Sequence, residues 1–184
     1  MNLTKITKIS ILNGLILLFL TLAEFLEFVK FDLILSYQWH KILHILGVIL
    51  FMGNMIVGPF WFLFAYYSKD KILLKFANRL LQLTDLYLTI PGVALTIING
   101  LFLASVFGGT KNQPWLFYSI ILLFVMWILS IPLIYFQEKM YSTIDNEPDN
   151  DIKINRYLIR WGIVGTIVMI PPTIIFYFMV VKII

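Results

Sequence analysis

The segment that decides the fold is Tyr37–Tyr67, which reads YQWHKILHILGVILFMGNMIVGPFWFLFAYY. It is almost entirely apolar and longer than the ~20 residues that a helix needs to cross a bilayer, so we expect a membrane helix that tilts, protrudes or bends. Both histidines of the chain, His40 and His44, lie near its start. Because a titratable side chain at membrane depth is costly to keep, this pair is the first candidate for a functional site.

The composition of the whole chain indicates a membrane protein. Of its 184 residues, 60% are hydrophobic and 13% are charged, whereas soluble domains are close to half apolar and a quarter charged. We therefore expect the lipid bilayer to be the main partner. The net charge of +4 does not indicate nucleic acid, because the Lys and Arg residues lie in short segments between apolar runs. The absence of cysteine excludes disulfides, cysteine-ligated metal centres and thiol catalysis.

Five apolar segments predict five membrane helices, which cover residues 11–29, 37–67, 85–107, 115–137 and 157–182. We expect the first to be retained, because the AEFLEFVK near its end lacks the small residues of a signal-peptide cleavage site. Its two acids, Glu24 and Glu27, are expected to be solvated at the interface. Pro59 and the Pro171-Pro172 pair predict bends in the second and fifth helices.

The segments between these helices are short and polar. Residues 68–84 place apolar side chains at helical spacing opposite Lys and Arg, which predicts a short amphipathic helix on the membrane surface. Residues 108–114 predict a turn, and residues 138–156 predict a solvated loop. The predicted fold class is therefore all-α: a multi-pass transmembrane helix bundle that forms a single integral membrane domain over residues 1–184.

The distribution of Lys and Arg predicts the orientation in the membrane. With the N-terminus in the cytoplasm, ten of the fourteen lie on the cytoplasmic side: Lys5, Lys8, Lys69, Lys71, Lys75, Arg79, Lys139, Lys153, Arg156 and Arg160. The other four lie outside: Lys30, Lys41, Lys111 and Lys182. We therefore predict a cytoplasmic N-terminus and an external C-terminus.

Two of the predicted helices have a stripe of small and polar residues along one side. On the second helix the stripe comprises His40, His44, Gly47, Phe51, Asn54 and Gly58; on the third it comprises Asp85, Thr89, Gly92, Thr96 and Asn99. Steps of three and four residues place each set on one helix face. Because polar groups inside a membrane need protein partners, we predict that the two stripes face each other. Asp85 begins the third helix and is predicted to cap it.

The two histidines differ in predicted depth. His40 lies near the interface, where we expect it to be solvated, whereas His44 lies one turn deeper. A neutral imidazole at that depth can bond a neighbouring helix, or it can ligate haem iron or copper. Two histidines on one helix face cannot take opposite sides of one haem, so a second ligand would be a methionine such as Met126 or Met169, another group or water. A ligating His44 needs an acceptor for its other N–H, and Asn99 is the side chain expected to supply it.

Short motifs in the chain also resemble a known group of membrane proteins. They are W-x-K-x-x-H at residues 39–44, Pro91-Gly92 near the start of the third helix, and Pro114-Trp115-Leu116 at the start of the fourth. On these motifs, residues 37–183 resemble the bacterial HemJ-type protoporphyrinogen oxidases and CopD-like membrane domains. They are most similar to a related family of predicted integral membrane proteins of unassigned function.

The resemblance implies a four-helix core over residues 37–183, to which the helix at residues 11–29 is added. It also implies haem b as cofactor, with His44 as the candidate ligand. HemJ-type chains have a Lys four residues after the Trp that opens the fourth helix, and this chain has Ser119 there. This difference weighs against a protoporphyrinogen oxidase-like activity, which the resemblance leaves open.

Three functions therefore remain open for a multi-pass protein of the bacterial inner membrane. The first is a haem b-binding redox protein that uses His44, with Asn99, Met126 and Met169 as further candidates beside the cofactor. The second is a copper-handling membrane protein that uses His40, His44 and methionines. The third is a structural or accessory membrane subunit without a cofactor. The haem interpretation implies an electron-transfer partner, and the sequence identifies neither that partner nor the number of copies in a homo-oligomer.

Overall fold

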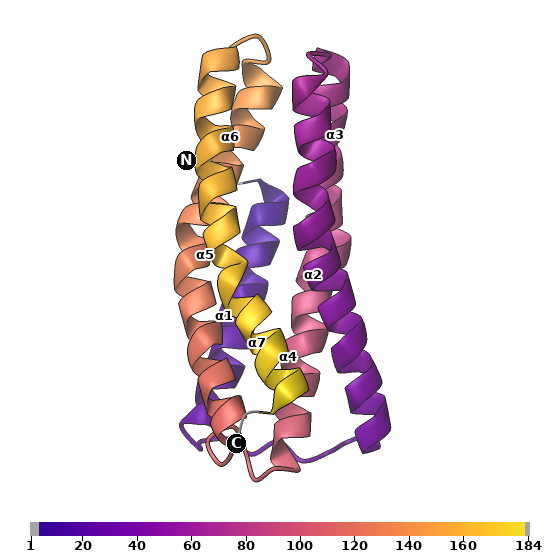
Figure 1. The fold of residues 1–184 in the computed structure, drawn as a ribbon, viewed down its shortest axis with the longest axis vertical. Helices are drawn as coiled ribbons and strands as arrows, with labels where there is room; N and C mark the ends of the chain where they lie inside the picture. The colour runs from indigo at the N-terminus through magenta and orange to yellow at the C-terminus, as the bar shows by residue number, and fades with distance from the viewer. Residues whose placement is uncertain (1–3, 183–184) are drawn as a thin grey trace.

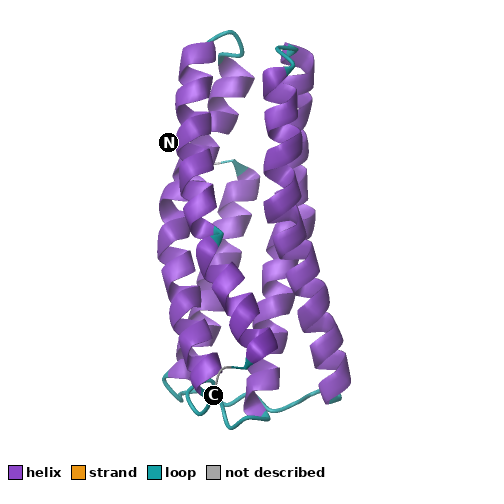
Figure 2. Ribbon diagram, in the orientation of Figure 1, coloured by secondary structure: helices purple, strands orange, loops and turns teal. Residues whose placement is uncertain are grey.

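The computed structural model describes residues 4–182, and this part of the chain is a bundle of helices without strands (Figure 2). The elements are α1 (Lys5–Phe25), α2 (Tyr37–Tyr67), α3 (Lys71–Thr84), the π-helical turn η1 (Asp85–Thr89), α4 (Ile90–Ser105), α5 (Pro114–Asn146), α6 (Asp151–Val168) and α7 (Ile170–Val181). The elements α3, η1 and α4 form one rod, and α6 and α7 form another. The described residues therefore contain five rods that are long and apolar enough to cross a membrane, which confirms the predicted fold class.

Local sequence explains where these helices begin and end. The carboxylate of Asp70 accepts hydrogen bonds from the backbone N–H groups of Ile72 and Leu73 and so caps α3. Pro114 occupies the first turn of α5, where a missing N–H is tolerated. The predicted break near Pro171 is confirmed, because α6 ends at Val168 and α7 begins at Ile170. Through Pro59, in contrast, α2 remains one continuous helix.

The rods form two groups joined by α1 (Figure 1). In one group α2 packs against the α3–η1–α4 rod, and in the other α5 packs against α6 and α7. Helix α1 contacts α4 and α5 and so touches both groups. We call the end formed by the turns at residues 68–70 and 147–150 the basic end. The opposite end, formed by residues 26–36 and 106–113, is called the loop end.

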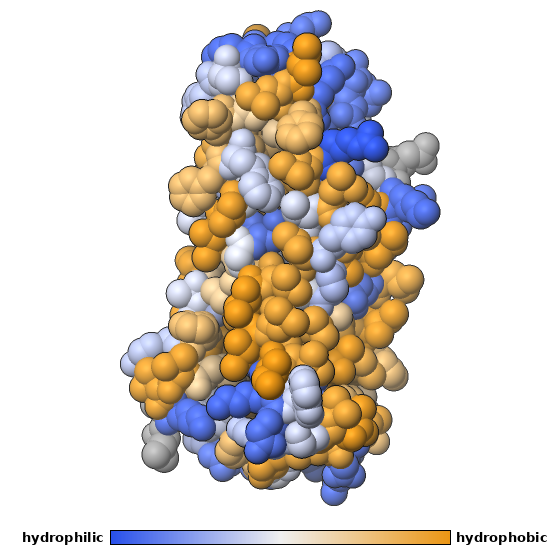
Figure 3. Space-filling view, turned by 90° about the vertical axis from the view of Figure 1, so that its right-hand side faces the viewer, coloured by the Kyte–Doolittle hydropathy of each residue, from blue (hydrophilic) through white to orange (hydrophobic). Residues whose placement is uncertain are grey.

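Buried apolar side chains hold the two groups together most strongly towards the basic end. Phe62 of α2, Met140 of α5 and Ile154 of α6 are each 0% exposed and belong to one cluster. Phe62 also packs edge-on against Trp161, with ring centroids 5.8 Å apart. Large apolar side chains on the outside of α2, among them Ile49, are exposed. Figure 3 shows such side chains in a broad band between two more polar ends, as expected for contact with lipid.

The segment at residues 68–84 is helical as predicted, but it does not form a separate helix on the surface. It continues through η1 into α4, and its apolar face packs into the bundle. Leu74, Ala77 and Leu81 are buried in the same cluster as Phe62. The expectation of a surface helix was wrong because amphipathic spacing shows that one face is covered, but not whether lipid or protein covers it.

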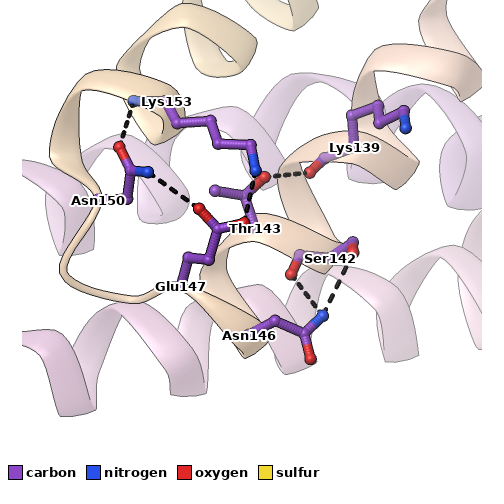
Figure 4. Close-up of polar contacts among 7 residues, drawn as sticks. All are labelled: Lys139, Ser142, Thr143, Asn146, Glu147, Asn150 and Lys153. Carbon is purple, nitrogen blue, oxygen red and sulfur yellow. Dashed lines mark hydrogen bonds and ion pairs between the residues drawn. The ribbon is translucent and has the colours of Figure 1, made fainter.

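The predicted loop at residues 138–156 is also mostly helical, because α5 extends to Asn146 and α6 begins at Asp151. The remaining turn is held by exposed polar side chains (Figure 4). Glu147 accepts from Lys153 Nζ and, at 2.9 Å, from Asn150 Nδ2, while Asn150 Oδ1 accepts from the backbone of Lys153 at 3.1 Å. Apart from the turn residues Glu147 and Asp149, the charged residues of this segment therefore lie on α5 and α6 rather than in a long loop, and Glu138 of α5 is buried.

Helix α1 is tied to the bundle by a glutamate at each end. Glu24, near its C-terminal end, accepts from the backbone N–H of Thr110 at 3.0 Å and from the hydroxyl group of the same residue. Glu138 of α5 accepts from the backbone N–H of Thr4 at 2.7 Å and from the hydroxyl of Thr7. Both carboxylates are buried. The expectation that Glu24 is solvated was wrong, whereas Glu27 is exposed and pairs with Lys111 at 3.2 Å.

Candidate functional site

The two polar stripes meet in a close contact that we call the α2–α4 seam, formed by α2 on one side and by η1 and α4 on the other. A Cβ atom added at Gly47 would lie 2.6 Å from the backbone nitrogen of Thr96, and one added at Gly92 would lie 2.7 Å from that of Phe51. Such distances leave room only for glycine. The prediction that the stripes face each other is confirmed, and glycine allows the two backbones to touch.

His40 is enclosed at the end of the seam nearest the loop end, and only 1% of it is exposed. Its Nε2 accepts from the backbone N–H of Leu35 at 3.2 Å, so its Nδ1 has the proton and donates to Asn99 Oδ1 at 2.8 Å. The ring also stacks on Phe102, with centroids 4.6 Å apart. The expectation that His40 is solvated was wrong, and both of its nitrogens are engaged within the protein.

His44 lies one turn further along α2 and is half-buried. Its Nδ1 lies 2.7 Å from the carbonyl oxygen of Thr96. A carbonyl only accepts, so Nδ1 has a proton, and in the neutral imidazole Nε2 then has the lone pair. Within residues 4–182, no hydrogen bond to Nε2 is formed. The acceptor of the His44 Nδ1–H is thus a backbone carbonyl of the facing stripe. It is not Asn99, which instead binds His40.

The ring of His44 rests on Gly100 of α4. A Cβ atom at that position would lie 3.2 Å from Cε1 and 3.3 Å from Nδ1 of the ring. Any larger residue there would press on the imidazole. The Thr96 carbonyl and the bare surface of Gly100 therefore fix both the tautomer and the position of this histidine, which is how proteins commonly hold a ligating imidazole.

The other predicted site residues are placed elsewhere. Asn99 is buried and engaged, since its Nδ2 donates to the carbonyl of Leu95 at 2.8 Å. Met126 is buried on α5, Met169 lies between α6 and α7, and these helices pack mainly against one another. Ser119 is buried, and its hydroxyl donates to the carbonyl of Trp115 at 2.6 Å. In residues 4–182 no group of three or more His, Asp or Glu side chains could hold a metal ion.

A second polar cluster lies on the seam towards the basic end and surrounds Asp85. Its Oδ1 accepts from Asn54 Nδ2 at 3.1 Å and from Thr89 Oγ1 at 3.2 Å. Its Oδ2 accepts from Gln137 Nε2 and, at 3.3 Å, from the hydroxyl of Tyr141. We call these five side chains the Asp85 cluster. The expectation that Asp85 caps a helix was wrong, because it lies at the π-helical turn inside a continuous rod.

The sequence placed part of this cluster and missed the rest. Asn54, Asp85 and Thr89 were expected on the facing stripes, but Gln137 and Tyr141 were assigned to a helix end and to a loop. An aspartate within an apolar rod is itself a signal of function. Π-helical turns also occur often at functional sites, yet they have no sequence signature strong enough to predict one here.

A comparison with protein families places the chain. Residues 38–183 match the family described as "Predicted integral membrane protein (DUF2269)". The chain belongs to this family. The match includes both histidines and the Asp85 cluster and leaves out α1. A search of curated proteins and a search of solved structures gave no match. The DUF2269 chain is therefore an integral membrane protein, and its family description names no activity.

Proposed function

We propose that the protein binds haem b in the membrane and that Nε2 of His44 would hold its iron. The observation that supports this proposal most is the hydrogen bonding of the two ring nitrogens of His44. Its Nδ1–H is committed to the Thr96 carbonyl at 2.7 Å, and its Nε2 has no hydrogen-bond partner among the described residues. Ligating histidines show this arrangement, in which the second nitrogen is fixed by a neighbouring acceptor.

The residues around His44 fit a haem ligand in their chemistry. Gly100 leaves space for the ring, and exposed apolar side chains beside it on α2, such as Ile45, suit the apolar faces of a porphyrin. When bound, haem supplies one-electron redox chemistry. The chain itself would contribute the imidazole of His44, the carbonyl of Thr96 that binds its Nδ1–H and leaves Nε2 for the ligand, and a helix contact that holds the ring in place. The resemblance of residues 39–44 to HemJ-type proteins adds support.

The copper alternative required both histidines, and the geometry favours it less. Both nitrogens of His40 are engaged, with Asn99 and with the backbone of Leu35, so copper would have to displace two hydrogen bonds of a buried side chain. The accessory-subunit alternative needs no cofactor, and the seam contacts are compatible with it. Haem binding is preferred because it uses the unpaired Nε2 of His44 and leaves the hydrogen bonds of His40 in place.

We also propose the bacterial inner membrane as the location, with the N-terminus in the cytoplasm. Lys75, Arg79, Arg156 and Arg160 lie on the helices of the basic end, as the excess of positive charge on the cytoplasmic side would require. Reporter fusions at Gly109 and Asn150 test this orientation. The proposal expects them on opposite sides, with Asn150 in the cytoplasm.

The haem proposal is tested by the visible spectrum of the purified protein from cells supplied with haem. We expect a Soret band in the parent protein, its loss in His44→Ala and its retention in His40→Gln. Glutamine is the matched control, because its amide can still accept from Leu35 and donate to Asn99. A band that is unchanged in His44→Ala, or a parent protein that gives no band on reconstitution, would reject haem binding. Metal analysis of the same samples distinguishes copper from no metal.

A further inference from the structure

We propose that Asp85 is a proton-binding site, which takes up and releases a proton on the side of the basic end. Asp85 lies six residues along the rod from the exposed Arg79, a rise of about 9 Å. Asp85 is fifteen residues from Asp70 at the basic end, a rise of about 22 Å, and twenty residues from Ser105 at the other end of its rod. The site therefore lies within the bundle, nearer to the basic end than to the loop end. The site is separate from the candidate haem ligand His44, because the contact at Gly47 and Gly92 lies between them.

The first step in the argument is the kind of partner that Asp85 has. Three exposed acids of the chain pair with lysine: Glu27 with Lys111, Glu147 with Lys153, and Asp151 with Lys71. Asp85 has only neutral donors, namely two amides and two hydroxyls. An anion without a cation is costly in a membrane-spanning bundle, and taking up a proton removes that cost.

The second step compares Asp85 with the two buried glutamates. Glu24 accepts from the backbone N–H of Thr110, and Glu138 accepts from the backbone N–H of Thr4. A backbone N–H can only donate, so one oxygen of each of these carboxylates is fixed as an acceptor. No backbone N–H donates to Asp85 among the described residues. Its donors are side chains whose hydroxyls can rotate and whose amides can turn over, so they can also accept from a protonated carboxyl.

The third step is a spare acceptor within the Asp85 cluster. Asn54 Nδ2 donates to Asp85 and, at 2.8 Å, to Thr89, and Gln137 Nε2 donates to Asp85 and Tyr141. Asn54 is 5% exposed, yet its Oδ1 is buried without a hydrogen-bond partner. Turning the Asn54 amide over would present this oxygen to a protonated Asp85. The ionised cluster thus already contains the acceptor that an added proton needs.

Among the charged and titratable groups near this site, Asp85 is the one that we expect to accept the proton. On α5, Tyr141 donates to Asp85, and Glu138 turns to Thr4 and Thr7 of α1. Arg79 of α3 and Lys8 of α1 are exposed, and α4 has no titratable residue. Protonation would weaken the charge-assisted bonds from Gln137 and Tyr141, so it would loosen α5 from η1.

Infrared spectroscopy of the full chain in lipid nanodiscs tests the proposal, with carboxyl-labelled aspartate to separate Asp from Glu. We expect a C=O band of a protonated aspartate that titrates with pH, is absent from Asp85→Asn and shifts in Tyr141→Phe. Glu138→Gln, the control at another buried carboxylate, should keep the band. Circular dichroism shows the pH range over which each protein stays folded.

Two results would overturn the proposal. One is a labelled band that Asp85→Asn leaves unchanged, or the absence of any such band at every pH at which the parent protein stays folded. The other is a labelled band that stays the same at every pH at which the parent protein stays folded, because a carboxyl group that takes up and releases a proton must titrate. Tyr141→Phe keeps the test decisive if Asp85→Asn fails to fold, because an unshifted band in that variant would also contradict the assignment.

Discussion

Both ends of the α2–α4 seam hold polar side chains between helices, but they differ in how many hydrogen bonds those side chains form. Towards the loop end, His44 keeps one ring nitrogen without a hydrogen bond among the described residues. Towards the basic end, every N–H and O–H of the side chains around Asp85 has an acceptor within the cluster. Between them, Gly47 and Gly92 bring two backbones into contact.

This difference separates two kinds of site. A half-buried lone pair such as that of His44 can bind a ligand from outside, because nothing in the protein has to be displaced. A closed cluster such as that of Asp85 can gain only something as small as a proton without coming apart. The glycine contact keeps the two apart, so each should respond to substitution independently.

The largest effect is expected for Gly47→Ala, which would break the contact between the two ends. The new Cβ would meet the backbone nitrogen of Thr96 at 2.6 Å, so α2 and α4 would have to separate. We expect a loss of about 3 kcal/mol in the free energy of unfolding, at the upper end for overpacked sites. Gly53→Ala is the control, because nothing lies within 4 Å of its Cβ. Equal stability of the two variants in detergent unfolding titrations would contradict the close contact.

Asp85→Ala is expected to have the next largest effect, and this effect should be confined to the Asp85 cluster. It would leave the amides of Asn54 and Gln137 and the hydroxyl of Tyr141 without their acceptor. We expect a loss of about 2 kcal/mol in unfolding free energy, since buried unpaired donors are costly. Asp149→Ala, at an exposed position, is the control. Haem binding should be unchanged in both, and its loss in Asp85→Ala would show that the two ends are not independent.

A smaller effect is expected for Gly100→Ala, beside His44. The added methyl group would lie 3.2 Å from the ring of His44 and would push it by a few tenths of an ångström. We expect haem affinity to fall about fivefold, which corresponds to ~1 kcal/mol. Gly162→Ala serves as control, because nothing lies within 4 Å of its Cβ. Soret titrations of the two variants make the comparison, and equal affinities would place the haem away from His44.

The smallest effect is expected at the exposed turn between α5 and α6. Hydrogen bonds from Lys153 and, to a smaller extent, from Asn150 lower the pKa of the Glu147 carboxyl group. Because the folded pKa lies below the unfolded one, the contribution to stability is present at neutral pH and is lost as the pH falls through the lowered pKa. Because this ion pair is exposed, its contribution is small, so Glu147→Gln should leave the free energy of unfolding almost unchanged. It should only speed hydrogen exchange at the Lys153 amide, whose acceptor Asn150 is held by Glu147. A clear loss of stability would mean that exposed ion pairs matter as much as the buried clusters.

Sequence patterns predicted most of the fold because the apolar segments are long. All of α2 was predicted from Tyr37 to Tyr67, and the break near Pro171 was also correct. The errors lie where a helix leaves the apolar region. Residues 71–84 and 138–146 are polar on one face, and only the packing of Leu74 and Ile144 into the bundle shows that they continue their rods.

The site was predicted in outline, but its hydrogen bonds were not. Helical spacing placed His44 opposite the stripe that contains Thr96 and Asn99, which the structure confirms. It could not show that a backbone carbonyl binds His44 while Asn99 binds His40, because spacing defines a face and not a contact. Gln137 reaches Asp85 from α5, and contacts between helices distant in sequence leave no local pattern.

The most direct test of His44 as haem ligand is rescue of His44→Gly by imidazole. Removing the side chain leaves the space beside Thr96 and Gly100 open to free imidazole, which supplies the same nitrogen ligand without the link to α2. We expect the variant to lose the Soret band of the parent protein and to regain it as imidazole is added, whereas His40→Gly with imidazole should change little. A Soret band in His44→Gly without imidazole, identical to that of the parent, would contradict ligation by His44.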